Sequence, residues 1–221
     1  MAKMRMSFGI ERPSGPSRHY FDFPAEVRST VENYTRNAIS EIDPAAFQQE
    51  ADYVAAVAAR LIGTPYHGRY GRVVLKSTIV SSRGPKSAES WSGVDWIITA
   101  TISDGTTMIE KAIVMQAKLG GIAHLSKREA NRLQGQVEKM KKLTAAPKIL
   151  EIPYTAGQRE PRIVSGNGLV QGRKLRSIPL GRYLSSRVLT TLHGDTRPAF
   201  IQAAQDSRLT QLQIEARLTK Q

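Results

Sequence analysis

Three polar side chains with complementary chemistry lie on two neighbouring segments of this sequence. Asp95 occurs in the segment Gly-Val-Asp-Trp, and Gln116 and Lys118 follow 21 and 23 positions later. Alternate residues of a β-strand face the same side, so Gln116 and Lys118 would project together. The apolar run just before Gln116 gives no packing reason for an amide and an ammonium group to follow it. A carboxylate, an amide oxygen and an ammonium group could together bind a divalent cation and stabilise a charged transition state.

Strand and turn signals predict how these three residues meet. Residues 94–102 and 111–119 have the composition of strands, and the Asp-Gly pair at 104–105 between them is typical of a hairpin turn. Pairing of the two strands would bring Asp95 beside Gln116 and Lys118 at one end of a sheet. Residues 112–115 are apolar on both faces, which indicates a central strand covered by helices.

The flanking segments supply further strands and helices. Asp43 followed by Pro44 is typical of a helix start, and Ser126 with Glu129 three residues later forms a capping-box pattern. Residues 63–65, Gly-Thr-Pro, should end the first long helix. Helices are predicted at residues 25–39, 46–62, 126–143, 180–192 and 198–218, and further strands at residues 72–82 and 148–154.

These elements predict an α/β fold in which helices flank a central mixed β-sheet. We expect an N-terminal arm at residues 1–42 and a core at residues 43–156. Residues 157–221 should form a basic, mostly helical C-terminal extension of the same domain.

Charge is distributed unevenly along the chain. Residues 1–118 carry 14 Lys and Arg against 12 Asp and Glu, whereas residues 119–221 carry 18 against 7, and the total is +13. A basic half of this kind favours a polyanionic partner such as nucleic acid, because Lys and Arg bind phosphates without regard to sequence. The alternative is a solvated surface that only keeps the protein soluble.

Several function classes are disfavoured by composition. The chain has no cysteine, which excludes disulfides, thiolate catalysis and Cys-ligated metal sites. No run approaches the roughly 20 apolar residues of a membrane span, and the N-terminus has no apolar signal-peptide segment. We therefore expect a cytoplasmic protein that does not contact membranes. His67, His124 and His193 lack metal-ligand spacing, and Trp91 and Trp96 are better explained as packing residues than as base-stacking platforms.

The two segments SAESWSGVDW and EKAIVMQAKL together resemble the PD-(D/E)xK (restriction-endonuclease-like) nuclease superfamily, in its QxK variant. The resemblance covers about residues 47–154, half of the chain. It implies that Asp95 is the family's metal-binding Asp, Gln116 its second metal ligand and Lys118 its catalytic Lys. Leu133, Gln136 and Met140 fit the basic helix that follows the QxK strand in this family.

Gln116 departs from the family's commoner Asp or Glu, and this has a consequence for the metal. Mg²⁺ prefers anionic oxygen ligands, so another acid should compensate for the neutral amide. Glu89 is the first choice and Glu50 on the preceding helix the second, with the backbone carbonyl of Ala117 as a further ligand. Asp52 and Glu110 are weaker alternatives.

The resemblance implies a Mg²⁺-dependent nuclease, for which Mn²⁺ can substitute. The substrate could be DNA or RNA, and the resemblance favours DNA, double-stranded DNA in particular. Defence against foreign DNA, mobile-element processing and repair all fit, as do a homo-oligomer or a partner protein of a larger system. The alternatives are a non-catalytic nucleic-acid-binding module on a diverged nuclease fold and an unrelated α/β protein that binds acidic partners. Phosphate contact is expected from the residues of the helix after the QxK strand, Lys127, Arg128, Arg132, Gln136, Lys139, Lys141 and Lys142.

Overall fold

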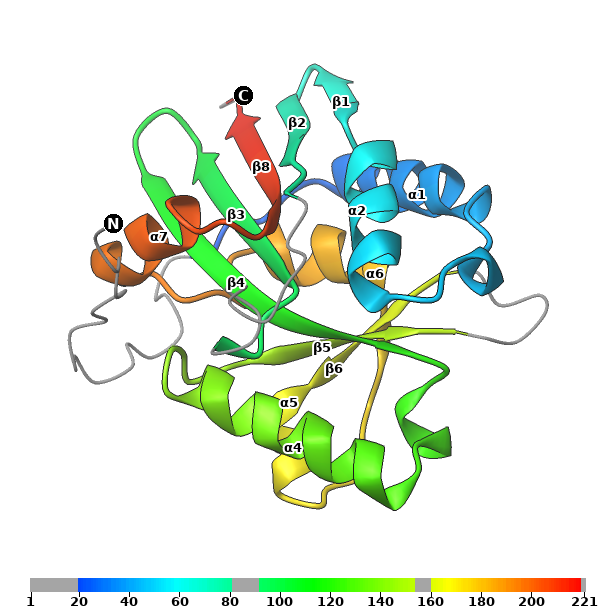
Figure 1. The fold of residues 1–221 in the computed structure, drawn as a ribbon. Coiled ribbons are helices and arrows are strands. Elements are labelled where there is room, and N and C mark those ends of the chain that lie inside the picture. The colour runs from blue at the N-terminus through cyan, green and yellow to red at the C-terminus, as the bar shows by residue number, and fades with distance from the viewer. Residues whose placement is uncertain (1–19, 81–91, 154–159, 220–221) are drawn as a thin grey trace.

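A computed structural model describes residues 20–80, 92–153 and 160–219, and a mixed β-sheet runs through all three stretches. Within these residues eight strands pair in the order β1-β2-β8-β3-β4-β5-β6-β7 (Figure 1). The strands are β1 (Gly63–Gly68), β2 (Gly71–Thr78), β3 (Trp96–Ser103), β4 (Met108–Leu119), β5 (Lys148–Ile152), β6 (Arg162–Ser165), β7 (Ile178–Pro179) and β8 (Thr210–Leu218). The expectation of an α/β fold with a central mixed sheet is therefore confirmed.

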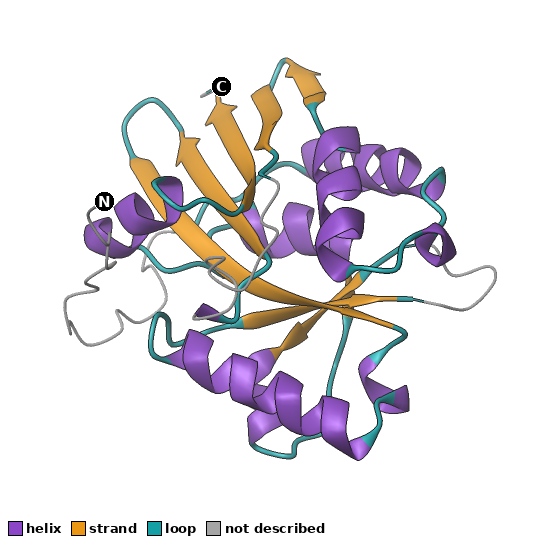
Figure 2. Cartoon of the chain, viewed as in Figure 1, coloured by secondary structure: helices purple, strands orange, loops and turns teal. Residues whose placement is uncertain are grey.

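Helices cover both faces of this sheet (Figure 2). They are α1 (Ala25–Ser40), η1 (Pro44–Ala46), α2 (Glu50–Arg60), η2 (Ile122–His124), α4 (Lys127–Lys141), α5 (Gly166–Val170), α6 (Leu180–Tyr183), the π-helix η3 (Leu184–Val188) and α7 (Pro198–Gln205). The larger core lies between the sheet and α1, α2 and α6, and a second core lies between the opposite face and α4 and α7. We call these the α1 face and the α4 face of the sheet.

The hairpin that positions the candidate site forms as the sequence predicts. β3 and β4 are antiparallel, with Trp96 opposite Met115 at one end and Ser103 opposite Met108 at the other. Asp104 stabilises the turn, because its Oδ1 accepts hydrogen bonds from the amides of Thr106 and Thr107 at 2.9 and 2.8 Å. β4 then pairs in parallel with β5, so it is a central strand.

The predicted helix at residues 198–218 is wrong. Its first half is α7, but the second half is β8, which lies in the middle of the sheet between β2 and β3 (Figure 1). Leu212, Ile214 and Ala216 are buried on the α1 face, and the polar residues between them point to the other side. This period of two is the pattern of a strand. The mostly helical C-terminal extension is therefore also wrong, since residues 162–218 supply three strands to the sheet.

Two other segments differ from expectation. Residues 63–65 end the helix as predicted but also begin strand β1, an edge strand where a proline is tolerated. Helix α1 lies within residues assigned to an arm, yet Val27, Val31 and Ile39 are buried in the core on the α1 face. Packing of this apolar stripe makes α1 part of the folded body.

Candidate active site

Asp95 and Gln116 lie side by side on the α4 face, where β3 begins. Both are buried, with exposed fractions of 6% and 4%. Gln116 Nε2 donates a hydrogen bond to Asp95 Oδ2, and it also lies 3.1 Å from the carbonyl oxygen of Ala117. The amide of Ala117 donates to the same Asp95 oxygen at 2.8 Å. The hairpin thus brings together the carboxylate, the amide and the carbonyl that the sequence predicts.

The donor atoms of this group are suitable for a hard divalent cation. Asp95 Oδ2 and the carbonyl oxygen of Ala117 converge on a single donor group, Gln116 Nε2. The other amide atom, Gln116 Oε1, is buried and has no hydrogen-bond partner among the described residues. Rotation about the terminal torsion of Gln116 exchanges the two atoms and would present three oxygens of different residues to one point. Oxygen ligands of this kind are those that Mg²⁺ and Mn²⁺ prefer.

Gly93 fixes the chain just before Asp95. Its φ of +71° lies in the left-handed region, and a Cβ atom at this position would lie 2.8 Å from the carbonyl oxygen of Gln136. Glycine is therefore required both by the backbone conformation and by the close approach of α4. Sequence reasoning did not single out Gly93, although a glycine two residues before a candidate ligand is a visible signal.

Lys118 and Glu50 form an ion pair at the edge of this group. Lys118 Nζ lies 3.0 Å from Glu50 Oε1, and the side chains are 19% and 30% exposed. Glu50 is the first residue of α2, so the sheet and the helix each contribute one partner. The structure therefore brings Glu50, the second choice for the compensating acid, to the candidate site.

Two further carboxylates lie near Lys118, and sequence reasoning assigned neither to the site. Glu151 is the direct neighbour of Lys118 across β4 and β5, and its Oε1 accepts a hydrogen bond from the amide of Ile122 at 2.8 Å. Glu129 completes the capping box of α4, and hydrogen bonds from Ser126 are the main reason that its pKa is lowered, with a smaller effect of the Lys118 charge. A glutamate among the apolar residues Ile149, Leu150 and Ile152 of β5 is the signal that could have identified Glu151.

The remaining candidate ligands are distributed as follows. Glu89, the first choice for the compensating acid, lies outside the described residues, as does Trp91. Asp52 is exposed on the first turn of α2. Glu110 is opposite Thr101, six residues along β4 from Gln116, and so lies away from the group. Across the three described stretches, no set of three or more His, Asp and Glu side chains is gathered as a metal-binding group.

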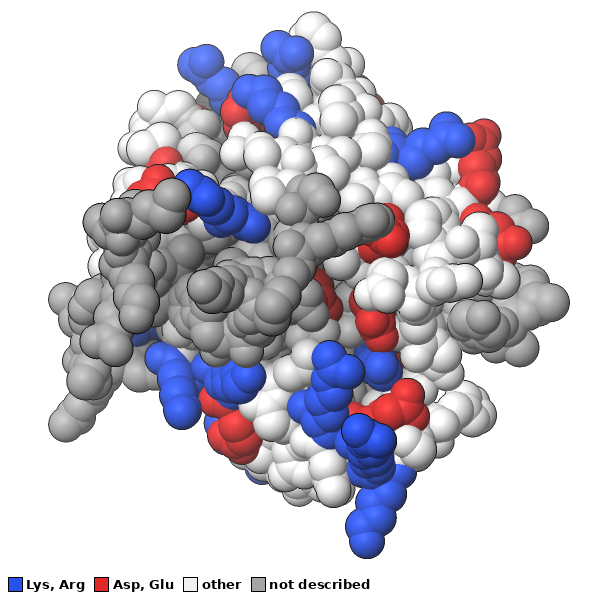
Figure 3. Space-filling view, in the orientation of Figure 1, with Lys and Arg blue, Asp and Glu red and all other residues white. Residues whose placement is uncertain are grey.

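The predicted phosphate-binding residues lie on α4 or, in the case of Lys142, at its C-cap, and most of them face outwards. Lys127, Arg128, Arg132, Lys139, Lys141 and Lys142 are exposed, whereas Gln136 is half-buried beside Gly93. Figure 3 shows Lys and Arg side chains gathered over α4, directly below carboxylates in the middle of the same face. This arrangement places the basic surface of α4 next to these carboxylates.

Some of the basic residues counted in the C-terminal half do not contribute to a surface. Lys148 is only 8% exposed, and burial, with a smaller contribution from Arg187, lowers its pKa to about 8. Arg197 is held by Asp195 at 2.7 Å and also donates to the carbonyl oxygen of Leu143. The net charge of residues 119–221, 18 Lys and Arg against 7 Asp and Glu, therefore overstates the positive surface available for a polyanion.

No family model, curated protein or solved structure matches this chain. None of the helices in the described stretches has the length and apolar character needed to span a bilayer.

Proposed function

We propose that this chain is a divalent-metal-dependent nuclease that hydrolyses phosphodiester bonds of DNA. The observation that carries the proposal is the grouping of Asp95, Gln116 and the Lys118–Glu50 pair beside the basic surface of α4. The buried oxygens of Asp95 and Gln116 and the carbonyl of Ala117 fit a hard cation, and Glu50 adds a second carboxylate. The resemblance to the QxK variant of the PD-(D/E)xK nucleases supports the same assignment of roles.

The side chains would divide the reaction between them. A cation bound by Asp95, Gln116 and Ala117 would supply Lewis-acid chemistry, polarising the scissile phosphate and lowering the pKa of water. Lys118 would orient the attacking water and stabilise negative charge that develops on the phosphate oxygens. Glu50 holds the ammonium group of Lys118 at 3.0 Å and so fixes its position. Exposed Lys and Arg of α4 would hold the phosphate backbone without reading its sequence.

Asp95→Ala and Lys118→Ala test the proposal directly. With Mg²⁺ or Mn²⁺ the wild-type protein should degrade plasmid DNA, and a chelator should abolish the reaction. Each variant should lose cleavage but retain DNA binding and the fold, measured by fluorescence anisotropy and circular dichroism. Asp206→Ala and Lys174→Ala are matched controls, because they remove the same charges from exposed positions. Cleavage at the wild-type rate by either site variant would refute the assignment of the active site.

The identity of the second acid has its own test. Glu89→Gln should strongly weaken the response to Mg²⁺ if Glu89 is a ligand, because Gln116 brings no charge to the site. Glu50→Gln should do so if the helix acid is the ligand, and here the Lys118 ion pair is lost as well. Isothermal titration of Mg²⁺ separates the two roles of Glu50, since weaker metal binding indicates a ligand and lower turnover alone indicates a positioning residue. DNA binding without cleavage in the wild-type protein would instead favour a non-catalytic module.

A further inference from the structure

A row of basic residues crosses three neighbouring strands at the end of the sheet farthest from α4. His67 of β1 is directly opposite Arg72 of β2, and Arg72 is directly opposite Arg217 of β8. All three residues are exposed. Neighbouring strands are about 4.8 Å apart, so the three side chains leave the sheet as a closely spaced line. We call these residues the basic row.

The basic row lies on the α4 face, the same face as Asp95. Arg217 pairs with Ser103 of β3, and Ser103 is an even number of residues from Asp95. Residues at even spacing along a strand face the same side. The even-numbered neighbours Ile102 and Ala216 confirm this, because both are buried in the core on the α1 face. The candidate active site and the basic row are therefore two ends of one side of the sheet.

The two arginines of the row have no acidic partner among the described residues. Within the part of the chain that the structure describes, no hydrogen bond or ion pair holds the side chain of Arg72 or Arg217, although nearby Lys76 is neutralised by Glu215 at 2.6 Å. Like charges placed directly opposite each other on neighbouring strands destabilise a sheet. An unpaired Arg–Arg rung therefore carries a cost that a bound anion would remove.

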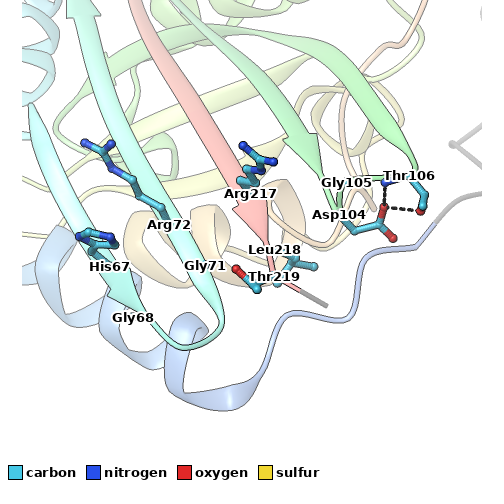
Figure 4. Close-up of a pocket in the computed structure, with 10 residues that line it drawn as sticks. All are labelled: His67, Gly68, Gly71, Arg72, Asp104, Gly105, Thr106, Arg217, Leu218 and Thr219. Atoms are coloured by element: carbon cyan, nitrogen blue, oxygen red, sulfur yellow. Dashed lines mark hydrogen bonds between the residues drawn. The ribbon is translucent and has the colours of Figure 1, made fainter. Parts of the chain in front are cut away.

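The row lines a hollow that can receive such an anion. Figure 4 shows Arg72 and Arg217 projecting from adjacent strands, with His67 beyond Arg72 and the β3–β4 turn on the other side. The hollow has a volume of about 550 Å³ and is open to solvent. Asp104 also lines it, but its Oδ1 is occupied by three donors of the turn, at 2.8–2.9 Å. Gly71 also lines the hollow, and a Cβ atom there would overlap the carbonyl oxygen of Arg217, so glycine lets the backbones of β2 and β8 approach closely at this point.

We propose that the basic row is a second phosphate-binding site, which holds the backbone of the nucleic-acid substrate away from the point of cleavage. Paired guanidinium groups suit phosphate oxygens, because each offers two parallel N–H donors. Ser103 is eight residues along β3 from Asp95, which is roughly 26 Å at 3.3 Å per residue. That length corresponds to about eight base pairs of duplex at 3.4 Å each. The site thus deepens the proposed nuclease function and rests on it.

The test compares Arg72→Gln/Arg217→Gln with wild type in DNA binding at several salt concentrations, with Ca²⁺ in place of Mg²⁺ to prevent cleavage. Each phosphate contact contributes about 0.9 to the log–log slope, so loss of two contacts should flatten the slope by about 1.8. Between 50 and 200 mM salt, wild type should lose about 12-fold more affinity than the variant. Arg36→Gln/Arg60→Gln is the matched control, because these two exposed arginines are already paired with Glu32 and Glu41.

Duplex length and kinetics give two independent readouts. The variant should flatten the salt slope of binding to a duplex of 20 base pairs. It should not change the slope for a duplex of six base pairs, which is too short to contact both the active site and the basic row. In Mg²⁺ the variant should show a KM for long DNA raised roughly tenfold, with kcat unchanged, because the row does not touch the reacting atoms.

The outcomes separate this proposal from the proposed function. If the variant keeps the salt slope of wild type and the protein cleaves DNA, the proposed role of the basic row is refuted and the nuclease function stands. Binding of inorganic phosphate at the row, without any effect of the variant on DNA affinity, would refute the role of the row in the same way. An equal loss of affinity in the variant on duplexes of six and 20 base pairs would refute the proposed distance between the active site and the basic row. A flattened slope in a protein that never cleaves DNA would uphold the row as a nucleic-acid contact and refute the nuclease.

Discussion

Lys111 is a buried lysine whose charge should make the stability of the protein depend on pH. It lies on the α1 face of β4, is 1% exposed and donates a hydrogen bond to the carbonyl oxygen of Val188. Burial lowers its pKa from 10.5 to about 7. A Cβ atom on Gly194 would lie 2.6 Å from Lys111 Cδ, so the glycine provides the space for this side chain.

The size of the effect follows from the two pKa values. A shift of about 3.5 units corresponds to about 5 kcal/mol, which is the full penalty when the amine is charged in both states. The unfolded chain binds more protons than the folded one between pH 7 and 10.5, so stability rises with pH throughout this window. The gain from pH 7 to pH 10 is about 3.5 kcal/mol, and the penalty is constant well below pH 7.

Lys111→Met removes this dependence while keeping a side chain of similar length. The carbonyl oxygen of Val188 stays satisfied, because the amide of Thr191 also donates to it at 3.0 Å. We expect the variant to be more stable than wild type by roughly 2–4 kcal/mol at pH 7 and nearly equal at pH 10. Urea denaturation at pH 7, 8, 9 and 10 measures the difference, and taking wild type minus variant removes the contribution of Lys148, which titrates in the same window. Parallel stability curves for the two proteins would refute the reasoning, even if the variant were less stable at every pH.

Three further predictions concern the candidate site. Gly93→Ala should lower the free energy of unfolding by at least about 2 kcal/mol and impair cleavage, because the new Cβ meets the backbone of α4 at Gln136. Gly105→Ala is the control, because Gly105 has a similar φ but open space around it. It should show only the smaller conformational cost in the same melting and cleavage assays. Gln116→Glu should tighten Mg²⁺ binding and retain activity with a shifted metal optimum, and complete inactivity at every Mg²⁺ and Mn²⁺ concentration would argue against Gln116 as a ligand. A triple alanine variant at the C-terminal end of α4 should flatten the salt slope of DNA binding by about 2. This is slightly less than three phosphate contacts would give, because Lys141 is paired with Glu138. An unchanged slope would show that this end of α4 does not touch phosphate. The substituted residues are Lys139, Lys141 and Lys142.

Local chemistry determined those parts of the fold that the sequence alone predicts. The Asp-Gly turn joins β3 to β4, and Ser126 with Glu129 caps α4, because each device acts within a few residues. The alternation that places Gln116 and Lys118 on one strand, opposite Asp95, likewise follows from strand geometry and a short turn. The sequence therefore predicts the hairpin that carries the central pair of the candidate site.

Tertiary pairing decided the course of β8, which local propensity predicts wrongly. Residues 211–218 are rich in Gln, Glu, Ala, Leu and Arg, all good helix formers, so propensity favours a helix. The burial of Leu212, Ile214 and Ala216 between β2 and β3 requires a period of two instead. Packing two neighbouring strands against this segment outweighs a preference worth only tenths of a kcal/mol per residue.

The partners of the site residues also depend on long-range contacts. Glu50 is 68 positions from Lys118, and only the packing of α2 against the sheet brings the two within 3.0 Å. Arg72 and Arg217 are 145 positions apart and become neighbours because β8 inserts beside β2. The sequence by itself determined which strand residues share a face, since that depends on backbone geometry. Which charges meet across that face was decided by the tertiary structure, because strand order and helix docking depend on burying the whole chain's apolar surface at once.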